Sequence, residues 1–166
     1  MTPFPPAPLF QSIAVDTHSH LQISRDTGRC QERKAYYIPE AGRTAKGQNL
    51  VNILELEEGE KITACISVDD FDDEHYLTMV TRRGVIKRTP LREYEYQRKG
   101  GKIALNLDEG DELLFVRCTT GDCELMLATR NGQAVRFREE NARVMGRTAR
   151  GVRGISLRDG DEVVGV

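Results

Sequence analysis

The residues best suited to chemistry are the cations of residues 81–102, because lysine and arginine side chains bind phosphate groups. This stretch reads TRRGVIKRTPLREYEYQRKGGK and carries eight cations, opposed only by Glu93 and Glu95. The whole chain has a formal net charge of −2, so positive charge is concentrated here. The paired Gly100 and Gly101 leave backbone N–H groups uncovered, which lets a loop approach a phosphate closely. The stretch predicts a phosphate-binding loop, and a solvated hairpin is the alternative.

A second basic stretch follows at residues 129–153, where seven arginines face only Glu139 and Glu140. The acidic residues gather elsewhere, at 55–60 and 69–74. We therefore expect the basic loops to form one positive band, with the acidic turns displaced from it. Such a band is typical of a protein that follows a phosphate backbone.

Two histidines in VDTHSHL, His18 and His20, could bind one metal ion from one side of a strand end. The phrase resembles the start of a metal-dependent hydrolase of the amidohydrolase type. Those enzymes use a (β/α)8 barrel of about 250 residues and further ligands. Only His75 remains in this chain and no βα alternation follows. A hydrolase fragment is therefore a remote alternative to two polar histidines at a strand end.

Composition indicates one domain or a few small repeats, since the chain has 166 residues, 39% of them hydrophobic, and no tryptophan. No segment approaches the ~20 apolar residues of a membrane span. The start, MTPFPPAPLF, lacks the basic region and long apolar run of a signal peptide, and its prolines predict a disordered lead-in over residues 1–9. Cys65 and Cys118 lie in apolar runs, which favours buried free thiols in a reducing cytoplasm.

The elements that position the cations recur at a spacing of about 50 residues. Three phrases, LELEEGE, LNLDEGD and ISLRDGD, occupy residues 54–60, 105–111 and 155–161. Each predicts a short alternating strand and an acidic turn, followed by an apolar strand at 62–68, 113–118 or 163–166. The hairpin turn at residues 81–84 recurs at 129–132, where Asn-Gly is a strong hairpin signal. A poorer hairpin is predicted at 21–33.

A glycine-rich loop also recurs, as GRTAKG at residues 42–47 and GRTARG at 146–151. The only helix-like stretch is brief, at 91–96. Repeats of about 50 residues with four short strands fit the blades of a propeller-like array. An aromatic content of 6% argues against a propeller that binds proteins through exposed aromatic side chains.

With these repeats in place, the residues resemble a known family. KAYYIPEAGRTAKGQNLVNILELEEGEKITACISV, from Lys34, and the final MGRTARGVRGISLRDGDEVVGV are similar to the C-terminal domain of the DNA gyrase A subunit. The resemblance implies an all-β fold of tandem four-stranded blades in an incomplete β-pinwheel. Its implied units are residues 1–9 (lead-in), 10–60 (remnant of a first blade), 61–111 (second blade) and 112–166 (third blade and start of a fourth).

The resemblance also implies the function: a non-catalytic part of a type II topoisomerase that wraps DNA and supports ATP-dependent negative supercoiling. The C-terminal domain of the topoisomerase IV A subunit is the near alternative. The implied partners are double-stranded DNA and, in an A2B2 assembly, the rest of the A subunit together with the B subunit, without a membrane. No catalytic residue, metal site or cofactor is expected in this chain, because ATP and magnesium act elsewhere in the enzyme.

The family's glycine-rich box, usually QRRGGKG, is similar to residues 97–102, but Ile103 replaces the last glycine. We interpret this segment as the equivalent loop of a later blade. Polar residues at 22, 24 and 30–32 depart from the family's strand pattern, so we expect the first thirty residues to be altered or truncated. The residues expected to contact DNA are Arg43, Lys46, Arg82, Arg83, Lys87, Arg88, Gln97, Arg98, Lys99, Gly100, Gly101, Lys102, Arg130, Arg136, Arg147, Arg150 and Arg153.

Overall fold

The structure, a computed structural model, describes residues 13–49, 52–96 and 100–166. The predicted lead-in at 1–9 and the candidates Gln97, Arg98 and Lys99 lie outside these residues. The fold is all-β, as predicted. Its strands are β1 (His20–Arg25), β2 (Arg29–Lys34), β3 (Ile62–Val68), β4 (Tyr76–Thr81), β5 (Val85–Pro90), β6 (Lys102–Ile103), β7 (Leu113–Thr119), β8 (Glu124–Thr129), β9 (Ala134–Arg138), β10 (Val152–Arg153) and β11 (Val163–Gly165).

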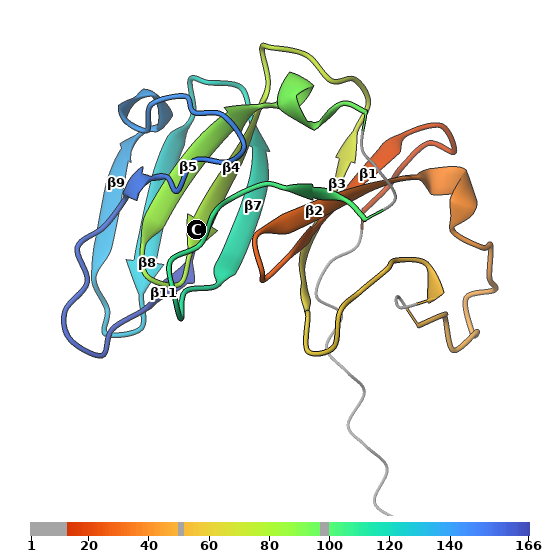
Figure 1. The fold of residues 1–166 in the computed structure, drawn as a ribbon, viewed down its shortest axis with the longest axis horizontal. Helices are drawn as coiled ribbons and strands as arrows, with labels where there is room; N and C mark the ends of the chain where they lie inside the picture. The colour runs from red at the N-terminus through yellow and green to blue at the C-terminus, as the bar shows by residue number, and fades with distance from the viewer. Residues whose placement is uncertain (1–12, 50–51, 97–99) are drawn as a thin grey trace, which may run out of the picture.

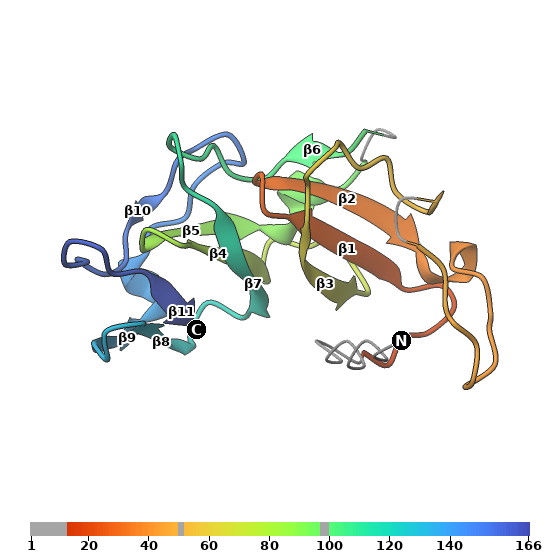
Figure 2. The same ribbon diagram turned by 90° about the horizontal axis from the view of Figure 1, so that it is seen from below.

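Three antiparallel sheets stand side by side (Figure 1). The first sheet has the order β3-β1-β2-β6, the second β10-β5-β4-β7 and the third β11-β8-β9. Figure 2 shows the same succession from below, with the second sheet between the other two. Each sheet is built on one hairpin: β1–β2, β4–β5 or β8–β9.

The sheets are interlocked through their outer strands. β6 follows the hairpin of the second sheet in sequence but pairs with β2 of the first. In the same way, β10 follows the third hairpin but pairs with β5 of the second sheet. The boundaries expected after residues 60 and 111 therefore delimit sequence repeats, whereas each complete sheet takes strands from both sides of such a boundary.

The three hairpins turn at glycines with positive φ. Gly28, Gly84 and Gly132 have φ values of 76°, 79° and 81°, which a side chain would disfavour. The turn at Gly28 confirms the poorer hairpin predicted at 21–33. The polar residues noted in that region lie in strands of the first sheet, where Gln22 and Cys30 are fully buried. β1 and β2 are the two inner strands of this sheet, so each has a paired strand on both sides.

Hydrophobic cores lie between successive sheets. One joins the first and second sheets through residues such as Ala64, Leu77 and Met79, and another joins the second and third through residues such as Ile86 and Leu127. The second sheet is thus covered on both faces, and most residues of β4 and β5 are buried. In β8, by contrast, buried and exposed residues alternate, because only one face has a neighbour within the described chain.

Three sequence-based expectations need correction. The phrases at 54–60, 105–111 and 155–161 contain the predicted acidic turns, but none of their residues lies in a strand. Cys118 is exposed and Cys65 only half-buried, whereas Cys30 is the thiol that is fully enclosed. The helix-like stretch is a single 3-10 turn, η3 (Leu91–Tyr94), and similar turns follow β2 and β9 at η1 (Ala35–Tyr37) and η4 (Glu139–Asn141).

Candidate nucleic-acid interface

The glycine-rich loops are positioned by close approach to a neighbouring sheet. Gly101 has a φ of 76°, and a Cβ there would lie 2.3 Å from the carbonyl oxygen of Cys30. Gly151 has a φ of 96°, with the equivalent distance to the oxygen of Ile86 at 2.6 Å. Only glycine fits at such distances, so these residues dock the short strands β6 and β10. Gly100 is exposed, a Cβ there would meet nothing within 4 Å, and its carbonyl oxygen accepts a hydrogen bond from the side chain of Arg29 at 3.1 Å.

Several candidate cations point into the protein instead of toward solvent. Lys87 is fully buried, and its Nζ donates to the carbonyl oxygens of Ala104, at 2.6 Å, and Arg147. Burial, reinforced by the nearby charge of Arg147, lowers the pKa of Lys87 to about 8. The Nζ of Lys102 donates to the carbonyl oxygens of Glu93 and Glu95, so this lysine closes the end of its own loop.

Arg88 is also buried, with 7% of its surface exposed. Its guanidinium lies 3.6 Å from the carboxylate of Glu139 and stacks over the ring of Tyr76, 4.6 Å from the ring centroid. Glu139 is fully buried and accepts hydrogen bonds from the hydroxyl of Thr119 and the backbone N–H of Gly121. The sequence analysis missed this carboxylate, because Glu139 resembles an ordinary surface residue at the end of a basic strand. Lys87 and Arg88 therefore leave the set of proposed phosphate ligands.

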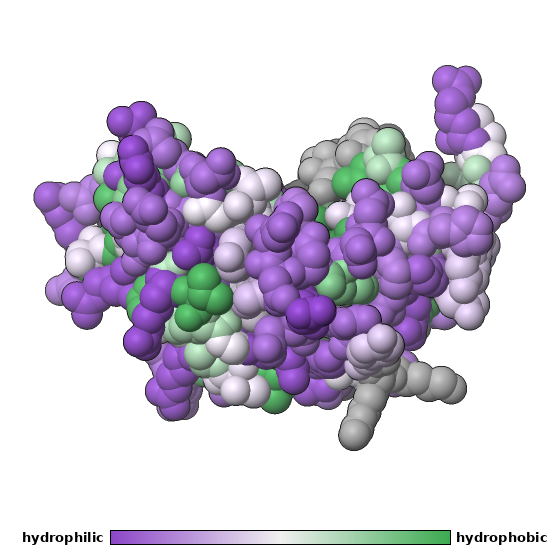
Figure 3. Space-filling model, turned by 90° about the horizontal axis from the view of Figure 1, so that it is seen from above, coloured by the Kyte–Doolittle hydropathy of each residue, from purple (hydrophilic) through white to green (hydrophobic). Residues whose placement is uncertain are grey.

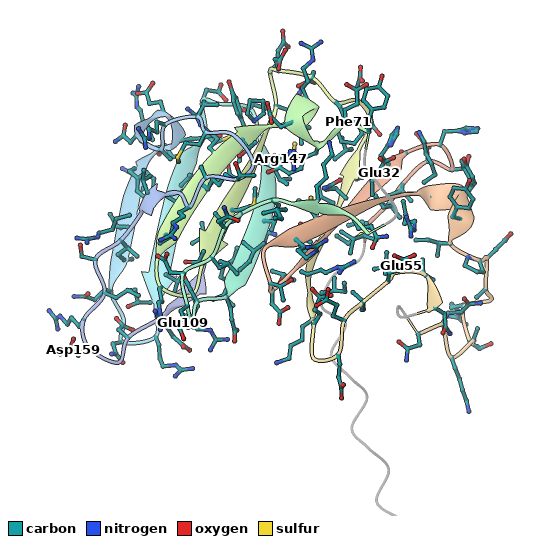
Figure 4. The ribbon with its side chains drawn as sticks, in the orientation of Figure 1. Glu32, Glu55, Phe71, Glu109, Arg147 and Asp159 are labelled. Atoms are coloured by element: carbon teal, nitrogen blue, oxygen red, sulfur yellow. The ribbon has the colours of Figure 1, made fainter. Side chains whose placement is uncertain are left out.

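The cations at the hairpin turns are paired with the acidic turns. Arg82 contacts the carboxylates of Glu112 at 2.8 Å and Glu162 at 3.3 Å, and Arg130 also pairs with Glu162. Arg83 is exposed, but its Nη1 donates to the carbonyl oxygen of Glu109. The expected separation of acidic turns from basic loops is therefore wrong at the hairpin turns. In Figure 4, Glu109 and Asp159 mark these acidic turns along the lower edge.

The glycine-rich loops carry the more accessible cations. Arg147 is half-buried, and its Nη1 donates to the carbonyl oxygen of Ile103 at 3.1 Å. Arg150 is 75% exposed in its side chain and pairs with Asp108 at 2.9 Å. Arg136, on β9, is similarly exposed beside Glu124. The exposed Arg43, Lys46 and Arg153 form no ion pair with any residue in the described ranges.

The face of the molecule seen from above is largely polar (Figure 3). Figure 3 views the molecule from above and shows a mostly hydrophilic face with separate hydrophobic patches. Arg147, labelled in Figure 4, lies nearer this upper edge than the acidic turns do. The exposed candidates that remain are Arg43, Lys46, Arg83, Gly100, Arg130, Arg136, Arg150 and Arg153.

The two histidines do not converge on one site. The Nδ1 of His20 contacts the carboxylate of Glu32, and its Nε2 contacts the Nζ of Lys34. His18 is exposed and meets the ring of Tyr36 edge-on, with ring centroids 6.1 Å apart. Within the described residues, no group of three or more His, Cys, Asp or Glu side chains could hold a metal ion. Both nitrogens of His20 are engaged, which disfavours the hydrolase alternative.

Comparison with known proteins decides the family. The profile of a family described as "DNA gyrase C-terminal domain, beta-propeller" matches residues 34–69, 75–120 and 124–166. This chain belongs to that family. The gyrase-like interpretation of the repeats is thus confirmed at the level of the family.

No helix among the described residues is long and apolar enough to cross a membrane.

Individual gyrase proteins are similar along most of this chain. The DNA gyrase A subunit of Clostridium acetobutylicum is 48% identical over 138 residues, which are 83% of this chain and 17% of that protein. The Staphylococcus epidermidis protein of the same name is 42% identical over 157 residues, covering 94% of this chain and 18% of the relative. The chain therefore spans less than a fifth of the relatives' length.

Solved structures give the same fold. The C-terminal domain of DNA topoisomerase IV superposes with a TM-score of 0.83 at 32% identity, covering 90% of this chain and 46% of that one. A DNA gyrase A C-terminal domain superposes with a TM-score of 0.72 at 26% identity, covering 91% and 48%. Both similarities place the three sheets in the β-pinwheel architecture.

Proposed function

We propose that this chain binds duplex DNA along the phosphate backbone, as the DNA-wrapping part of a gyrase-type A subunit. The observation that supports the proposal best is the set of exposed cations on the repeated glycine-rich loops and on β10, which follows the second loop. Arg43, Lys46 and Arg153 have no opposing carboxylate among the described residues, so their charge is available to phosphates. Membership of the gyrase C-terminal family indicates that the ligand is DNA, and the exposed loops are the surface that we propose contacts it.

Binding through this surface is expected to be independent of base sequence. The longest helical element in the described chain is the four-residue η3, so no described helix could lie in a major groove to read base edges. Arginine side chains on loops of successive sheets can instead follow phosphates along a bent duplex. Flexible DNA sequences should bind better, because bending brings more phosphates to the loops.

The test is a titration of duplex DNA at several salt concentrations, with the wild type and an Arg150→Ala/Arg153→Ala variant. Each lost phosphate contact should lower the slope of log K against log salt by roughly 0.9. A matched control, Lys61→Ala/Arg117→Ala, removes the same charge from exposed positions outside the glycine-rich loops. If the two variants lose affinity and slope equally, the effect is one of net charge, and the proposed surface is wrong.

In the whole enzyme, we propose that this domain supports ATP-dependent negative supercoiling within an A2B2 assembly in the cytoplasm. ATP and magnesium would act on other parts of that assembly. The four cysteines of the chain are free thiols, which fits a reducing compartment. Placing Arg150→Ala/Arg153→Ala in the full-length gyrase protein that contains this domain should lower supercoiling while relaxation without ATP persists. Equal loss of both activities would contradict a role in wrapping.

Topoisomerase IV is the second candidate, because the higher TM-score belongs to its C-terminal domain. The sequence comparison favours gyrase, with identities above 40% to the A subunits of several bacterial gyrases. The complete enzyme distinguishes the two: net introduction of negative supercoils supports gyrase, and decatenation without supercoiling supports topoisomerase IV.

A further inference from the structure

One exposed aromatic side chain lies on the segment that leads from β5 of the second sheet to β6 of the first. Tyr96 is 84% exposed, more than any other large hydrophobic residue in the described ranges. Tyr94, two residues earlier, is fully buried in the core between the two sheets. A ring left in water contributes little to that core, so folding alone does not account for an aromatic residue at position 96.

The backbone of Tyr96 is held in an unfavourable conformation. Its φ is 55°, and every other described residue with a positive φ is a glycine. Residues with a Cβ disfavour this left-handed region, and tyrosine lacks the short polar side chain that makes it tolerable for asparagine. Strain of this kind persists only where the surrounding structure fixes the backbone, and it gathers at binding sites.

The residues before Tyr96 provide that support. The Nζ of Lys102 donates to the carbonyl oxygens of Glu93, at 3.3 Å, and Glu95. The N–H of Glu95 donates to the oxygen of Arg92 at 3.1 Å, which closes the turn of η3. The chain is thus anchored as far as Glu95, and the bend at Tyr96 leaves its ring in solvent.

The equivalent position after the third hairpin is used differently. Val144 forms a parallel bridge with Arg88 of β5, and the N–H of Met145 donates to the oxygen of Arg88 at 2.9 Å. Tyr96 instead lies in a bend and takes part in no such bridge within the described ranges. The loop that leads to β10 therefore docks along a strand at the place where the segment that leads to β6 presents its ring to solvent.

Cations lie at the base of this ring. Lys102 contacts the carbonyl group of the residue before Tyr96, and the Nε of Arg147 lies 3.9 Å from the carboxylate of Glu93. Burial and the nearby charge of Arg147 lower the pKa of Lys102, so the two cations are neighbours. A flat apolar ring beside cations suits a polymer that has flat bases and an anionic backbone.

We propose that the ring of Tyr96 packs against the sugar and base surface of duplex DNA and fixes the position at which the duplex bends. This inference rests on the proposed function, because it requires the exposed cations of the chain to hold the neighbouring phosphates. A side chain that enters between two base pairs unstacks them and kinks the duplex. Steps that deform easily, such as TA, lower the cost of this distortion.

The ring contact differs from the cation contacts in its dependence on salt. The phenol is neutral at physiological pH, and a hydrogen bond to the side chain of Glu95 raises the pKa of Tyr96 further. An uncharged ring releases no counterions when it binds, so its contribution to the free energy of binding does not change with salt concentration. Removing the ring should therefore lower affinity and leave the slope of log K against log salt unchanged.

The test is a titration of duplex DNA at several salt concentrations with the wild type, Tyr96→Gly and Tyr96→Phe. Glycine removes the ring and relieves the positive φ, so Tyr96→Gly should melt no lower than the wild type and yet bind about tenfold more weakly. Its salt slope should be that of the wild type, and its preference for duplexes with TA steps over A-tracts should shrink. Tyr96→Phe keeps the ring and should bind like the wild type.

The outcomes separate this inference from the proposed function. A wild type without salt-dependent binding overturns both. Binding that Tyr96→Gly retains at full strength, or loses together with part of the salt slope, overturns the role of the ring alone. Weaker binding by Tyr96→Phe would also overturn it, since the hydroxyl and not the ring would then make the contact.

Fluorescence gives a second readout, because the chain contains no tryptophan. Tyr96→Trp places a single indole at the proposed contact. The matched control is Val164→Trp, since Val164 is 49% exposed on β11, which Figure 2 shows on the side away from β6. Duplex DNA should quench the emission of Tyr96→Trp and shield it from acrylamide, and it should leave Val164→Trp unchanged. Equal responses of the two variants, or no response of Tyr96→Trp while DNA is bound, would overturn the proposal.

Discussion

Replacing Lys87 with methionine tests whether a buried charge is held at the junction of the first two sheets. The side chain is fully buried and joins the carbonyl oxygens of Ala104 and Arg147, which belong to successive glycine-rich segments. Its pKa is lowered from 10.5 to about 8, mainly by burial. Methionine keeps the length and apolar character of the side chain but has no titrating group.

The expected magnitude follows from linkage. Because folding lowers the pKa, the unfolded chain binds more protons between pH 8 and pH 10.5, so the free energy of unfolding rises with pH across that window. At neutral pH, burying the charged lysine lowers the free energy of unfolding by an amount on the order of 3 kcal/mol, since one pKa unit corresponds to about 1.4 kcal/mol. About 2 kcal/mol of this penalty should be relieved between pH 7 and pH 9.5.

The assay is urea unfolding of the wild type and Lys87→Met at several pH values from 7 to 9.5. The difference between the two proteins isolates Lys87, because other groups titrate in both. The wild type should gain about 2 kcal/mol relative to the variant as the pH rises. A difference that is constant with pH, or that changes in the opposite direction, would refute a lowered pKa at this lysine.

Two further variants test the junctions. Gly101→Ala combines a positive φ with a Cβ 2.3 Å from the oxygen of Cys30, so it should lower the free energy of unfolding by more than the 1–2 kcal/mol or so of a left-handed residue alone. Gly47→Ala has the φ penalty only, since a Cβ there would meet nothing within 4 Å, and equal losses would contradict close docking of Gly101. Glu139→Gln leaves buried Arg88 without its carboxylate and should lower the free energy of unfolding by about 3–5 kcal/mol. An unchanged melting temperature would show that this pair does not stabilise the third sheet.

The hairpins could be predicted from sequence because their turn chemistry is local. Gly84 and Asn131-Gly132 allow few backbone conformations other than a tight turn between extended segments. The exchange of outer strands could not be predicted in this way. β6 and β10 are only two residues long and pair with strands more than 60 residues away, so neither periodicity nor local propensity indicates their partners.

The candidate interface was predictable in location but not in the role of each cation. Charge and recurrence identified the glycine-rich loops, and the structure places Arg150 and Arg153 on their surface. The same criteria also selected Lys87 and Arg88, since composition does not distinguish a cation facing solvent from one inside a sheet covered on both faces. A usable signal was the unbroken strand Val85–Pro90, in which Lys87 and Arg88 occupy opposite faces.

The structural demands on a glycine-rich loop explain why its charges divide between two roles. Docking brings the backbone of Gly101 or Gly151 against a strand carbonyl, and the nearby carbonyl groups then need donors. Lys87 and Arg147 supply such donors from within the junction, so their charge stabilises the fold. The exposed side chains of Arg150 and Arg153 are not needed for docking and remain accessible to phosphates. Positive charge in this protein therefore serves both assembly of the sheets and the proposed DNA contact, and mutations must be interpreted according to the exposure of each residue.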